Sequence, residues 1–537
     1  MPSALRHSVL RYVFIFCVLC FAVFYFSENS ADNDLWGHVL FGQELLRTGH
    51  LARTEPYSWT APGHAWINHE ILAEAALGLA HRALGGPGLL LLKIVVGLLT
   101  LLLALAIAVK QKANEPQPPL VIVAWAFGAL AVMEIARSFA ARPQIFTALA
   151  LATEFWLLTQ IHAGRRHWAL ALPPLFALWI NTHGGVLAGL LALFLTAACA
   201  IVQPIIGKFI PRFKLESVPG TTRWLWLALA ASVLALFANP YGAGLVRWLV
   251  GSVRWLRPEI EEWNPIRLSW AFAAFYLAAV LAAAGFLLSR RPLALWQLAV
   301  TCLFGFMAVR SARHAPLFCL TALAFAPPHL AEMLRRLPNS WTHWMRVFLR
   351  PAGQRILTVL LALTAAGILF VAGTLHKERP WTMEISRQYH PVAAIEFIKA
   401  HGLHGNLLVF FDWGEECLWE LPDNRVSIDG RLDTCYPRDV IAAQFKFYSA
   451  EPFNPMALNL THADIALLPS EMTSALQLAQ RGGWQPVYVD DLALVLVREA
   501  DQFPGLGGLK LPVVGTGTTK GRAAFPDRPS LRLERLK

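Results

Sequence analysis

Charged residues are scarce in this sequence. Only 15% of its 537 residues are Asp, Glu, Lys or Arg, whereas soluble domains carry about 25%. Hydrophobic residues make up 56% of the chain, so we expect a protein that crosses a membrane many times. The formal net charge of +11 does not indicate a nucleic-acid partner, because the basic residues fall in short loops between apolar runs.

Cysteine is also scarce, and none of the seven is spaced as in a C-x-x-C metal motif. Cys417 and Cys435 lie outside the apolar runs, and the sequence leaves open whether they form a disulfide. No internal repeat of about 20–50 residues is present. No clear small-residue cleavage site follows the first apolar run, so we expect this run to be a retained membrane span rather than a signal peptide.

A membrane-spanning helix needs about 20 apolar residues, and about eleven segments approach this length. Another apolar segment, 68–85, is interrupted by charged residues. We expect it to form an amphipathic helix in the membrane interface, capped by Asn68 and stopped by the Gly-Gly-Pro sequence at 85–87. The expected spans are 9–26, 88–109, 119–137, 143–162, 167–181, 184–206, 223–239, 268–288, 292–310, 314–331 and 355–374.

The basic residues test this choice of spans. With a cytoplasmic N-terminus, the cytoplasmic loops contain the basic clusters, which is the positive-inside pattern. Counting 68–85 as a further span would place every later cluster outside. We therefore expect the first loop, 27–87, and everything after Leu375 to be extracytoplasmic. The clusters are Lys110 and Lys112; Arg165 and Arg166; Lys208, Arg212, Lys214 and Arg223; Arg290 and Arg291; and Arg335, Arg336, Arg346, Arg350 and Arg355.

Three domains follow from this pattern. Residues 1–375 form a polytopic α-helical membrane domain that includes the first outer loop. Residues 376–500 have ordinary charge density and short apolar runs, which predict a small α/β domain with strands at 407–411, 465–468 and 492–497 and helices at 391–401 and 473–481. Residues 501–537 are basic and rich in Gly and Pro, so we expect this tail to be disordered.

Polar residues at the outer ends of the expected spans suggest a site on that side of the membrane. Carboxylates, imidazoles, amides and arginines gather there, whereas the cytoplasmic loops carry basic residues and little else. The set comprises Asp32, Asp34, His38, Glu55, His64, Asn68, His69 and Glu70 in the first loop; Arg137 and Arg142; Asn181 and His183; Asn239 and Tyr241; Glu259, Glu261 and Glu262; and Arg310, Arg313 and His314.

The stretch ADNDLWGH, residues 31–38, is the most informative part of the first loop. Apolar positions over 34–46 predict a short helix with Asn33 or Asp32 as its cap and Gly49 as its stop. Asp34 and His38 are four residues apart and so share a face. A carboxylate with a neighbouring imidazole can deprotonate an acceptor hydroxyl, and the Asp32–Asp34 pair could instead hold a divalent metal such as Mg²⁺ or Mn²⁺. The alternative is that these carboxylates only cap a helix.

Arginines flank two breaks between expected spans. Arg137 and Arg142 lie beside Pro143, and Arg310 and Arg313 lie shortly before Pro316. Arg binds phosphate in a bidentate manner, and a lipid phosphate is the natural ligand at this depth. The alternative is contact with lipid headgroups alone. Asn181, His183 and His314 stand at comparable positions, where a polar side chain is either structural or part of the same site.

The layout resembles the GT-C superfamily of membrane glycosyltransferases, which includes protein O-mannosyltransferases, oligosaccharyltransferases and aminoarabinose transferases. The resemblance rests on DNDLWGHVLFGQELLRTGH, TEPYSWTAPGHAWINHE and the arginine-bearing span ends. It implies a lipid-linked sugar donor, with Asp34, or else Asp32, as general base and with Glu55 or the His69–Glu70 pair nearby. One departure is that Asn33 separates the two aspartates, whereas mannosyltransferases pair Asp directly with Glu. This leaves the identity of the base and the need for a metal open.

The outer domain carries FFDWGEECLWELPDNRVSIDGRLD, which is similar to a bacterial membrane-protein family of this type. Its DWG and IDGRLD segments predict turns at strand ends. Asp429, Arg431 and Asp433 either contact an acceptor or form a structural Asp–Arg pair.

These features predict transfer of a sugar from polyprenyl phosphate to an envelope acceptor, on the outer face of a bacterial inner membrane. Protein, lipid and polysaccharide acceptors all remain open. A transporter or lipid flippase is the second hypothesis, although transporters bury charges at mid-bilayer and often show inverted repeats. A non-catalytic scaffold that retains the fold is the third.

Overall fold

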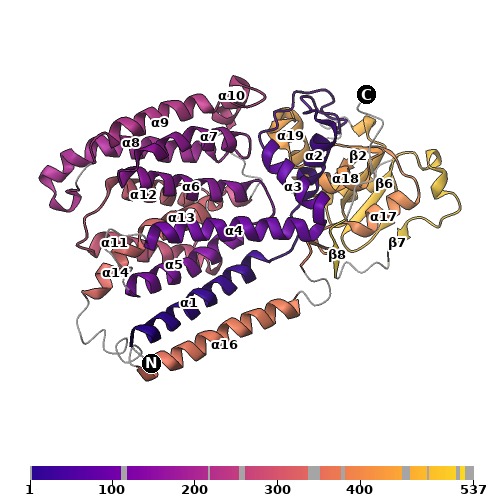
Figure 1. The fold of residues 1–537 in the computed structure, drawn as a ribbon. Coiled ribbons are helices and arrows are strands. Elements are labelled where there is room, and N and C mark those ends of the chain that lie inside the picture. The colour runs from indigo at the N-terminus through magenta and orange to yellow at the C-terminus, as the bar shows by residue number, and fades with distance from the viewer. Residues whose placement is uncertain are drawn as a thin grey trace. The chain divides into compact units, whose positions relative to one another are not determined.

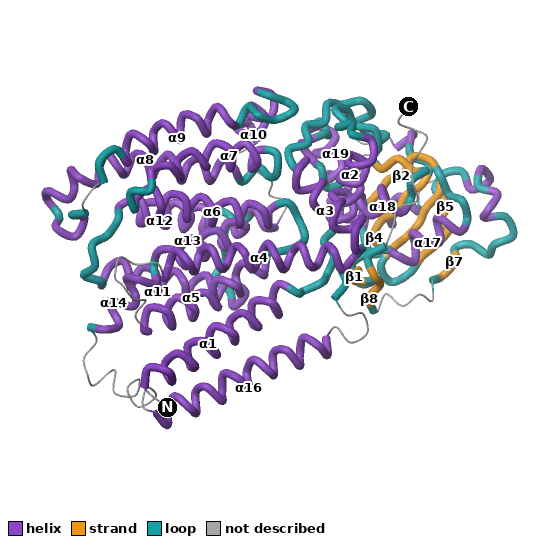
Figure 2. The backbone as a smooth tube through the Cα atoms, viewed as in Figure 1, coloured by secondary structure: helices purple, strands orange, loops and turns teal. Residues whose placement is uncertain are grey.

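The protein is described here from a computed structural model, which divides into two compact units. The structure describes residues 3–109, 118–215, 218–252, 261–336, 351–375, 381–449, 460–480, 483–515 and 521–526. Unit 1 comprises residues 1–28 and 91–380, and unit 2 comprises residues 29–90 and 381–537. Unit 1 contains helices and loops, whereas strands occur in unit 2 (Figures 1 and 2).

Each expected span coincides with helical structure. Among the described residues, five helices are long and apolar enough to cross a membrane, or six if a bent pair counts as one span. Shorter apolar helices fill the remaining expected spans. The helices are α1 (Ser3–Phe26), α4 (Gly86–Val109), α5 (Pro118–Arg137), α6 (Gln144–His162), α7 (Leu172–Ile180), α8 (Val186–Phe209), α9 (Thr221–Ala235), α10 (Ala243–Ser252), α11 (Ala273–Leu288), α12 (Leu295–Arg310), α13 (Ala315–Phe325), α14 (Pro327–Arg335) and α16 (Pro351–Leu375).

Two of these spans are irregular for reasons that the sequence contains. The expected span 314–331 consists of α13 and α14, which meet at an angle of 53°. Pro327 and Pro328 lack backbone N–H groups and their rings oppose a continuous helix, so the chain bends at this point. The short span 167–181 begins as the 3-10 helix η1 (Arg166–Ala171) before α7 continues it.

Contacts between helix ends agree with the expected alternation of the spans of unit 1. At one end, the ring of Phe26 lies 5.1 Å from that of Phe139, and Asn181 Nδ2 donates to the carbonyl oxygen of Ala238 at 2.8 Å. At the other end, His162 stacks on Trp296 at 5.0 Å. These contacts agree with expected outer residues at one end of the bundle and described basic clusters at the other. Lys110, Lys112, Glu259, Arg346 and Arg350 lie outside the described residues.

Unit 2 contains two helices of the first loop, α2 (Leu35–Thr48) and α3 (Ile71–Leu84). Gly49 ends α2 in the left-handed conformation with φ 66°, as predicted. The predicted N-terminal caps are wrong: Asp34 precedes α2 and Glu70 precedes α3. Asn68 instead turns the chain before α3, since its Oδ1 accepts the Glu70 N–H at 2.9 Å.

The two helices of the first loop pack closely because each contributes a glycine at the crossing. A Cβ on Gly42 would collide with the backbone carbonyl of Glu74, and one on Gly78 would lie 2.8 Å from the backbone nitrogen of Gln43. This close approach places the first turns of α3 beside α2.

The rest of unit 2 is built on a six-stranded mixed sheet of order β3-β2-β4-β6-β5-β7. The predicted strands and helices are confirmed as β2, β4, β6, α17 and α20. Three short or exposed strands and two helices were not predicted. The elements are β2 (Gly405–Val409), β3 (Asn424–Val426), β4 (Ile465–Pro469), β5 (Gln485–Val489), β6 (Ala493–Val497), β7 (Val513–Val514), α17 (Val392–Ala400), α18 (Gly414–Glu420), α19 (Arg438–Ser449) and α20 (Thr473–Ala479).

The first loop belongs to the sheet unit, which differs from the domain division expected from the sequence. Beside β3, Ser58 forms a bridge to Val426, and Trp59 Nε1 donates to the carbonyl oxygen of Leu407 at 3.2 Å. Thr60 Oγ1 donates to the carbonyl oxygen of Ser427 at 2.6 Å. These hydrogen bonds join segments more than 340 residues apart, which no local pattern predicts.

Part of the tail is ordered, so the expectation of disorder is wrong for residues 503–515 and 521–526. Strand β8 (Arg522–Ala524) pairs with β1 (Glu384–Ser386), and Phe525 is only 1% exposed. The Phe525 ring lies 5.1 Å from Trp36 and 5.7 Å from Trp419. Cys417 and Cys435 are both buried free thiols.

Candidate functional site

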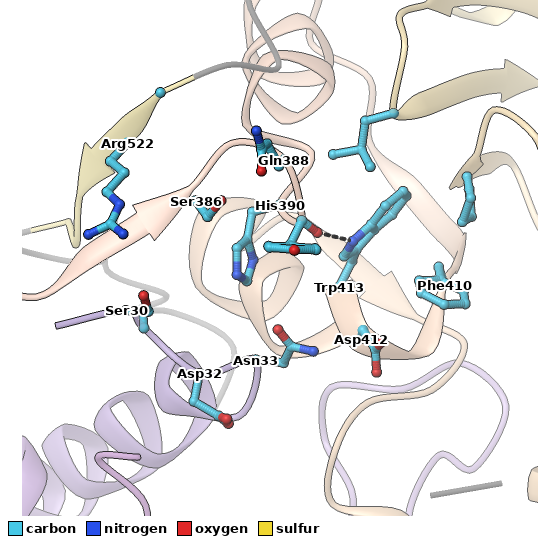
Figure 3. A pocket seen from close by; sticks show the side chains of 15 residues that line it. Ser30, Asp32, Asn33, Ser386, Gln388, His390, Phe410, Asp412, Trp413 and Arg522 are labelled. Atoms are coloured by element: carbon cyan, nitrogen blue, oxygen red, sulfur yellow. Dashed lines mark hydrogen bonds between the residues drawn. The ribbon is translucent and has the colours of Figure 1, made fainter. Parts of the chain in front are cut away.

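The acidic segment after α1 lines a cavity of about 640 Å³ in unit 2 (Figure 3). Residues 30–33 contribute from the first loop, and the other walls come from the C-terminal part of the unit. Its walls combine aromatic rings with hydrogen-bonding groups, a composition found in ligand sites. We call it the ADND cavity; its walls include Ser30, Ala31, Asp32, Asn33, Ser386, Gln388, Tyr389, His390, Phe410, Asp412, Trp413 and Arg522.

The aromatic wall of the ADND cavity is held in place by one hydrogen bond. Trp413 is 2% exposed, and its Nε1 donates to the carbonyl oxygen of Tyr389 at 2.8 Å (Figure 3). Tyr389 is 70% exposed as a residue. An exposed aromatic ring that borders a cavity offers a flat apolar surface to a ligand.

Asp34 lies beside Glu415 rather than among the residues that line the cavity. A side chain on Gly430 would collide with Asp34 Oδ1 and would also meet Glu415 Oε1, so both carboxyl groups approach this glycine of the IDGRLD segment. Glu415 Oε2 accepts the Gly37 N–H at 3.1 Å. Burial raises the pKa of Glu415 well above its ordinary value, and the neighbouring Asp34 and Asp429 raise it further. The raised pKa of Glu415 favours the protonated form of the carboxyl group that lies beside Asp34.

His38, one turn along the chain from Asp34, faces the carboxylates of Glu74 in α3 and of Glu70 just before α3. Its Nδ1 lies 3.6 Å from Glu74 Oε1 and 4.0 Å from Glu70 Oε2. Burial alone would lower the pKa of His38, but Glu74, Glu70 and Asp34 outweigh it and raise the pKa. Among the described residues, His38, Glu70 and Glu74 are the group whose ligand atoms all lie within 4.8 Å, as a metal site requires. Asp32 and Asp34, the expected metal ligands, are not part of this group. His69 lies beside Glu70, with its Nε2 atom 3.6 Å from Glu70 Oε1.

Glu55, an expected substrate-binding residue, lies in the interior of unit 2. It is 2% exposed, and its Oε2 pairs with Arg431 Nη1 at 2.5 Å. Arg431 also binds both carboxylate oxygens of Asp429, at 2.8 and 2.6 Å. The guanidinium carbon lies 4.6 Å from the centroid of Trp66, with three further rings around it. The three further rings are those of Phe41, Tyr57 and Tyr436. The structure therefore supports a structural role for the Asp429–Arg431 pair. Asp433, in the next turn, is half-buried.

A buried ion pair in α18 was missed by sequence reasoning. His390 Nδ1 and Glu416 Oε2 lie 2.9 Å apart, and both residues are at most 3% exposed. The signal in the sequence was the pair Glu415-Glu416 inside the otherwise apolar run WGEECLW. Carboxylates at such positions are buried against partners that other segments supply.

Glu416 predicts a pH dependence of stability. Burial raises its pKa above the ordinary value of 4.5, and His390 only partly offsets this rise. The folded state therefore binds the proton more tightly, so this stabilisation is present at acidic pH and is lost as pH rises through the raised pKa. We expect Glu416→Gln to flatten the decline in melting temperature as the pH rises above the ordinary carboxyl value of 4.5, measured by tryptophan fluorescence in detergent. A decline as steep as that of the wild-type protein would contradict the prediction.

The expected arginines of unit 1 differ in their surroundings. Arg137 donates to Glu134 at 2.8 Å and stacks over Phe272 at 3.9 Å. Arg313 lies 3.7 Å from Glu262 and stacks over Trp263 at 4.2 Å. Arg142 is half-buried and Arg310 is exposed at the end of α12.

The other expected site residues of unit 1 are Asn181, His183 and His314, whose side chains contact groups close to them in the structure. Asn181 is 9% exposed and donates to the carbonyl oxygens of Ala177 and Ala238. His183 Nδ1 accepts the Gly185 N–H at 3.1 Å and lies 2.8 Å from Thr147 Oγ1. His314 is half-buried beside Arg313 in the 3-10 turn η5 (Ala312–His314). Asn181 is thus held by backbone groups, while His183 fixes the turn between α7 and α8.

Comparison with solved structures identifies the fold. The archaeal oligosaccharyltransferase AglB from Archaeoglobus fulgidus, in complex with an inhibitory peptide and a dolichol-phosphate, is 11% identical, with a TM-score of 0.56 over 86% of this chain and 69% of that chain. ArnT from Cupriavidus metallidurans, bound to undecaprenyl phosphate, is 14% identical, with a TM-score of 0.54 over 93% of this chain and 99% of that chain. By sequence, no family model and no characterised protein matches the chain. The predicted resemblance is confirmed at the level of architecture: the chain has the fold of the polytopic GT-C membrane glycosyltransferases, with a C-terminal sheet domain.

Proposed function

We propose that this protein transfers a sugar from a polyprenyl-phosphate donor to an acceptor that binds in the ADND cavity. The observation that carries the proposal is that the acidic segment after α1 borders a cavity with aromatic and polar walls. The fold adds support, since the two solved proteins described above hold dolichol-phosphate and undecaprenyl phosphate.

In the proposed reaction, Asp34 is the general base: it directly follows the wall residue Asn33, and the reacting hydroxyl of the acceptor would lie at that edge of the cavity. The proton of the acceptor hydroxyl moves to the Asp34 carboxylate as the acceptor oxygen bonds to the anomeric carbon of the sugar. The bond from that carbon to the phosphate oxygen breaks, and its electron pair leaves with the polyprenyl phosphate. Attack opposite the leaving group inverts the configuration at the anomeric carbon. Asp32, which lines the cavity, is the alternative base and otherwise orients the acceptor.

For the donor we propose the arginines at one end of the unit 1 bundle. Arg137, Arg142, Arg310 and Arg313 would hold the departing phosphate, because guanidinium groups match phosphate oxygens in geometry and charge. This end would face the outside of a bacterial inner membrane, with the N-terminus in the cytoplasm. The acceptor would then be an envelope protein, lipid or polysaccharide.

A transfer assay tests the proposal. The full-length protein, purified in detergent, is incubated with a panel of undecaprenyl-phosphate hexoses and pentoses and with envelope acceptors. Glycosylated acceptor, detected by mass spectrometry together with released undecaprenyl phosphate, supports the proposal. If the Asp34→Asn variant no longer forms glycosylated acceptor, the transfer is due to this protein and not to a contaminating enzyme. Absence of transfer from every donor, with movement of the labelled lipid across vesicle membranes, would replace the proposal by a flippase.

Tyr389 gives a separate prediction about the acceptor. We expect Tyr389→Ala to raise the KM for the acceptor by roughly tenfold with little change in kcat, because a stacking surface worth about 1 kcal/mol or more is lost. Tyr389→Phe keeps the ring and should stay near the wild-type values. Leu476→Ala, at an exposed position on α20, is the control for truncation of a surface side chain in the same unit. Equal effects of Tyr389→Ala and Leu476→Ala would contradict the prediction.

A further inference from the structure

We propose that five arginines at one end of the unit 1 bundle bind the headgroup of an anionic phospholipid. These residues, which we call the arginine cluster, come from three separate segments of the chain: Arg212, Arg290, Arg291, Arg335 and Arg336. Helix α12 begins at Leu295, shortly after Arg291, and ends at Arg310. The cluster therefore lies at the opposite end of this helix from Arg310, one of the arginines assigned to the donor phosphate, and the proposal stands whether or not the chain transfers a sugar.

Backbone carbonyls at the end of α11 bring two of the three segments together. Arg212, in the turn after α8, donates to the carbonyl oxygen of Phe286 and, at 2.9 Å, to that of Leu287. Arg336, directly after α14, donates to the carbonyl oxygen of Leu288 at 3.4 Å. The last carbonyl groups of a helix have no partner within the helix, so they attract basic side chains. Both arginines are therefore held at the same helix end.

The close packing of α11 against α14 positions the other arginines. A Cβ on Gly285 would lie 3.1 Å from the backbone nitrogen of Leu330, so the two helices approach each other closely. The Arg290 N–H donates to Glu332 Oε2 at 2.9 Å, which joins the loop after α11 to α14. This loop is therefore held beside the end of α14, where Arg335 lies.

The arginine cluster has little negative charge to balance it. Among the described residues within five positions of these arginines in the sequence, Glu332 is the one carboxylate, and it lies 3.7 Å from Arg336 Nε. Within the same part of the chain, the guanidinium groups of Arg290 and Arg335 have no hydrogen bond or ion pair. Burial lowers the pKa of Arg291, and Arg335 lowers it further, although Glu332 opposes the change. An anion bound among these arginines would relieve their mutual repulsion.

Apolar side chains beside the cluster indicate that the anion belongs to a lipid. Leu287 and Leu288 are exposed and come directly before the arginine-bearing loop, and Phe209 and Ile210 are exposed just before Arg212. Acyl chains pack against apolar surface of this kind, while the headgroup lies at the level of the charged groups. Basic sites between membrane-spanning helices bind phospholipid headgroups in this manner. A soluble anion would gain nothing from the apolar side chains.

The number and spread of the arginines indicate a headgroup with two phosphates. A guanidinium group binds phosphate oxygens in a bidentate manner, so one phosphate is satisfied by two or three arginines. The cluster contains five, divided between the loop after α11, the end of α14 and the turn after α8. Cardiolipin carries two phosphates on one headgroup and can contact these segments together, whereas phosphatidylglycerol carries one phosphate.

Lipid binding by the full-length protein tests the proposal directly. The protein is delipidated in detergent and titrated with cardiolipin, phosphatidylglycerol or phosphatidylcholine, and bound lipid is counted by native mass spectrometry. We expect the first cardiolipin to bind at least tenfold more tightly than phosphatidylcholine, and the double variant Arg291→Gln/Arg335→Gln to lose roughly tenfold or more of this affinity.

The double variant Arg165→Gln/Arg166→Gln is the matched control. It removes the same charge from another loop at the same end of the bundle, since His162, shortly before that loop, stacks on Trp296 at the start of α12. This variant should bind cardiolipin as the wild-type protein does. The control separates a built site from the general attraction between basic loops and an anionic membrane.

A measurement on the wild-type protein covers the case in which a variant fails to fold. Cardiolipin with a photoreactive diazirine near its headgroup is crosslinked to the protein, and the modified peptides are mapped by mass spectrometry. Adducts should fall on residues 286–291 and 330–336, and excess inorganic phosphate should not prevent them. Equal affinity for cardiolipin and phosphatidylcholine, equal losses in the two double variants, adducts confined to other segments, or displacement by inorganic phosphate would overturn the proposal. None of these outcomes bears on sugar transfer, which the transfer assay measures separately.

Discussion

Asp34→Asn is expected to lower sugar transfer by roughly 10²–10⁴-fold, the usual contribution of a positioned general base. The amide has nearly the shape of the carboxylate but cannot accept the acceptor proton. Because Asp34 precedes α2 without a side-chain capping bond, the helix should survive the change. The measurement is the initial rate of transfer, with equal amounts of membrane-inserted wild-type and variant protein.

Asp32→Asn is the matched comparison for this prediction. Asp32 Oδ1 accepts the Asp34 N–H at 3.1 Å, a bond that an amide oxygen also accepts. If Asp34 is the base, Asp32→Asn should alter mainly the KM for the acceptor, since Asp32 lines the cavity. A larger loss of kcat in Asp32→Asn than in Asp34→Asn would reassign the base to Asp32. Wild-type rates in both variants would remove the acidic segment from the chemistry.

Arg431→Met is expected to destabilise unit 2 by about 3–5 kcal/mol, because it leaves two buried carboxylates without their cation. Arg431 binds Asp429 from the same turn and Glu55 from the first loop. Asp429 is fully buried and Glu55 is 2% exposed, so solvent cannot replace the guanidinium. Arg431→Lys should also destabilise, since an ammonium group cannot make the bidentate contact within the ring of aromatic side chains.

Thermal unfolding in detergent and limited proteolysis of the first loop measure this effect. Arg498→Met is the control: Arg498 lies 3.8 Å from Asp464 in the same unit, but its side chain is 29% exposed. A partly exposed pair of this kind contributes about 0–1 kcal/mol. Equal losses of stability in the two variants would contradict the structural role assigned to Arg431.

The secondary structure of the membrane unit could largely be predicted from the sequence. Apolar runs of this length are typical of membrane-spanning helices. The basic loops between them indicate which ends of the helices lie on the same side of the membrane. The same local rules placed Gly49 at the end of α2 and the core strands β2, β4 and β6. They failed for β3 and β7, which are too short to carry a periodic signal. The bend at Pro327 was readable in principle, because two successive prolines oppose a continuous helix.

The candidate site was only partly accessible to sequence reasoning. The acidic segment was identified because two aspartates and a histidine are unusual just after a span. Its partners were not, since Glu415, Gly430 and Tyr389 are about 350–400 residues away along the chain. Glu55 was predicted to be a site residue because the sequence shows its charge. The sequence does not show that this carboxylate is buried against Arg431.

The sequence by itself determined that this chain crosses a membrane many times, that polar residues gather at one end of its spans, and that a small α/β domain follows. Hydrophobicity and helix or strand periodicity act locally, so they can be read without a structure. Only the tertiary structure decided that the first loop joins the sheet unit, that Asp32 borders the ADND cavity while Asp34 adjoins Glu415, and that His38 faces Glu70 and Glu74. Each of these depends on contacts between distant segments, whose geometry is set by packing and by the burial of charge rather than by neighbours in the chain.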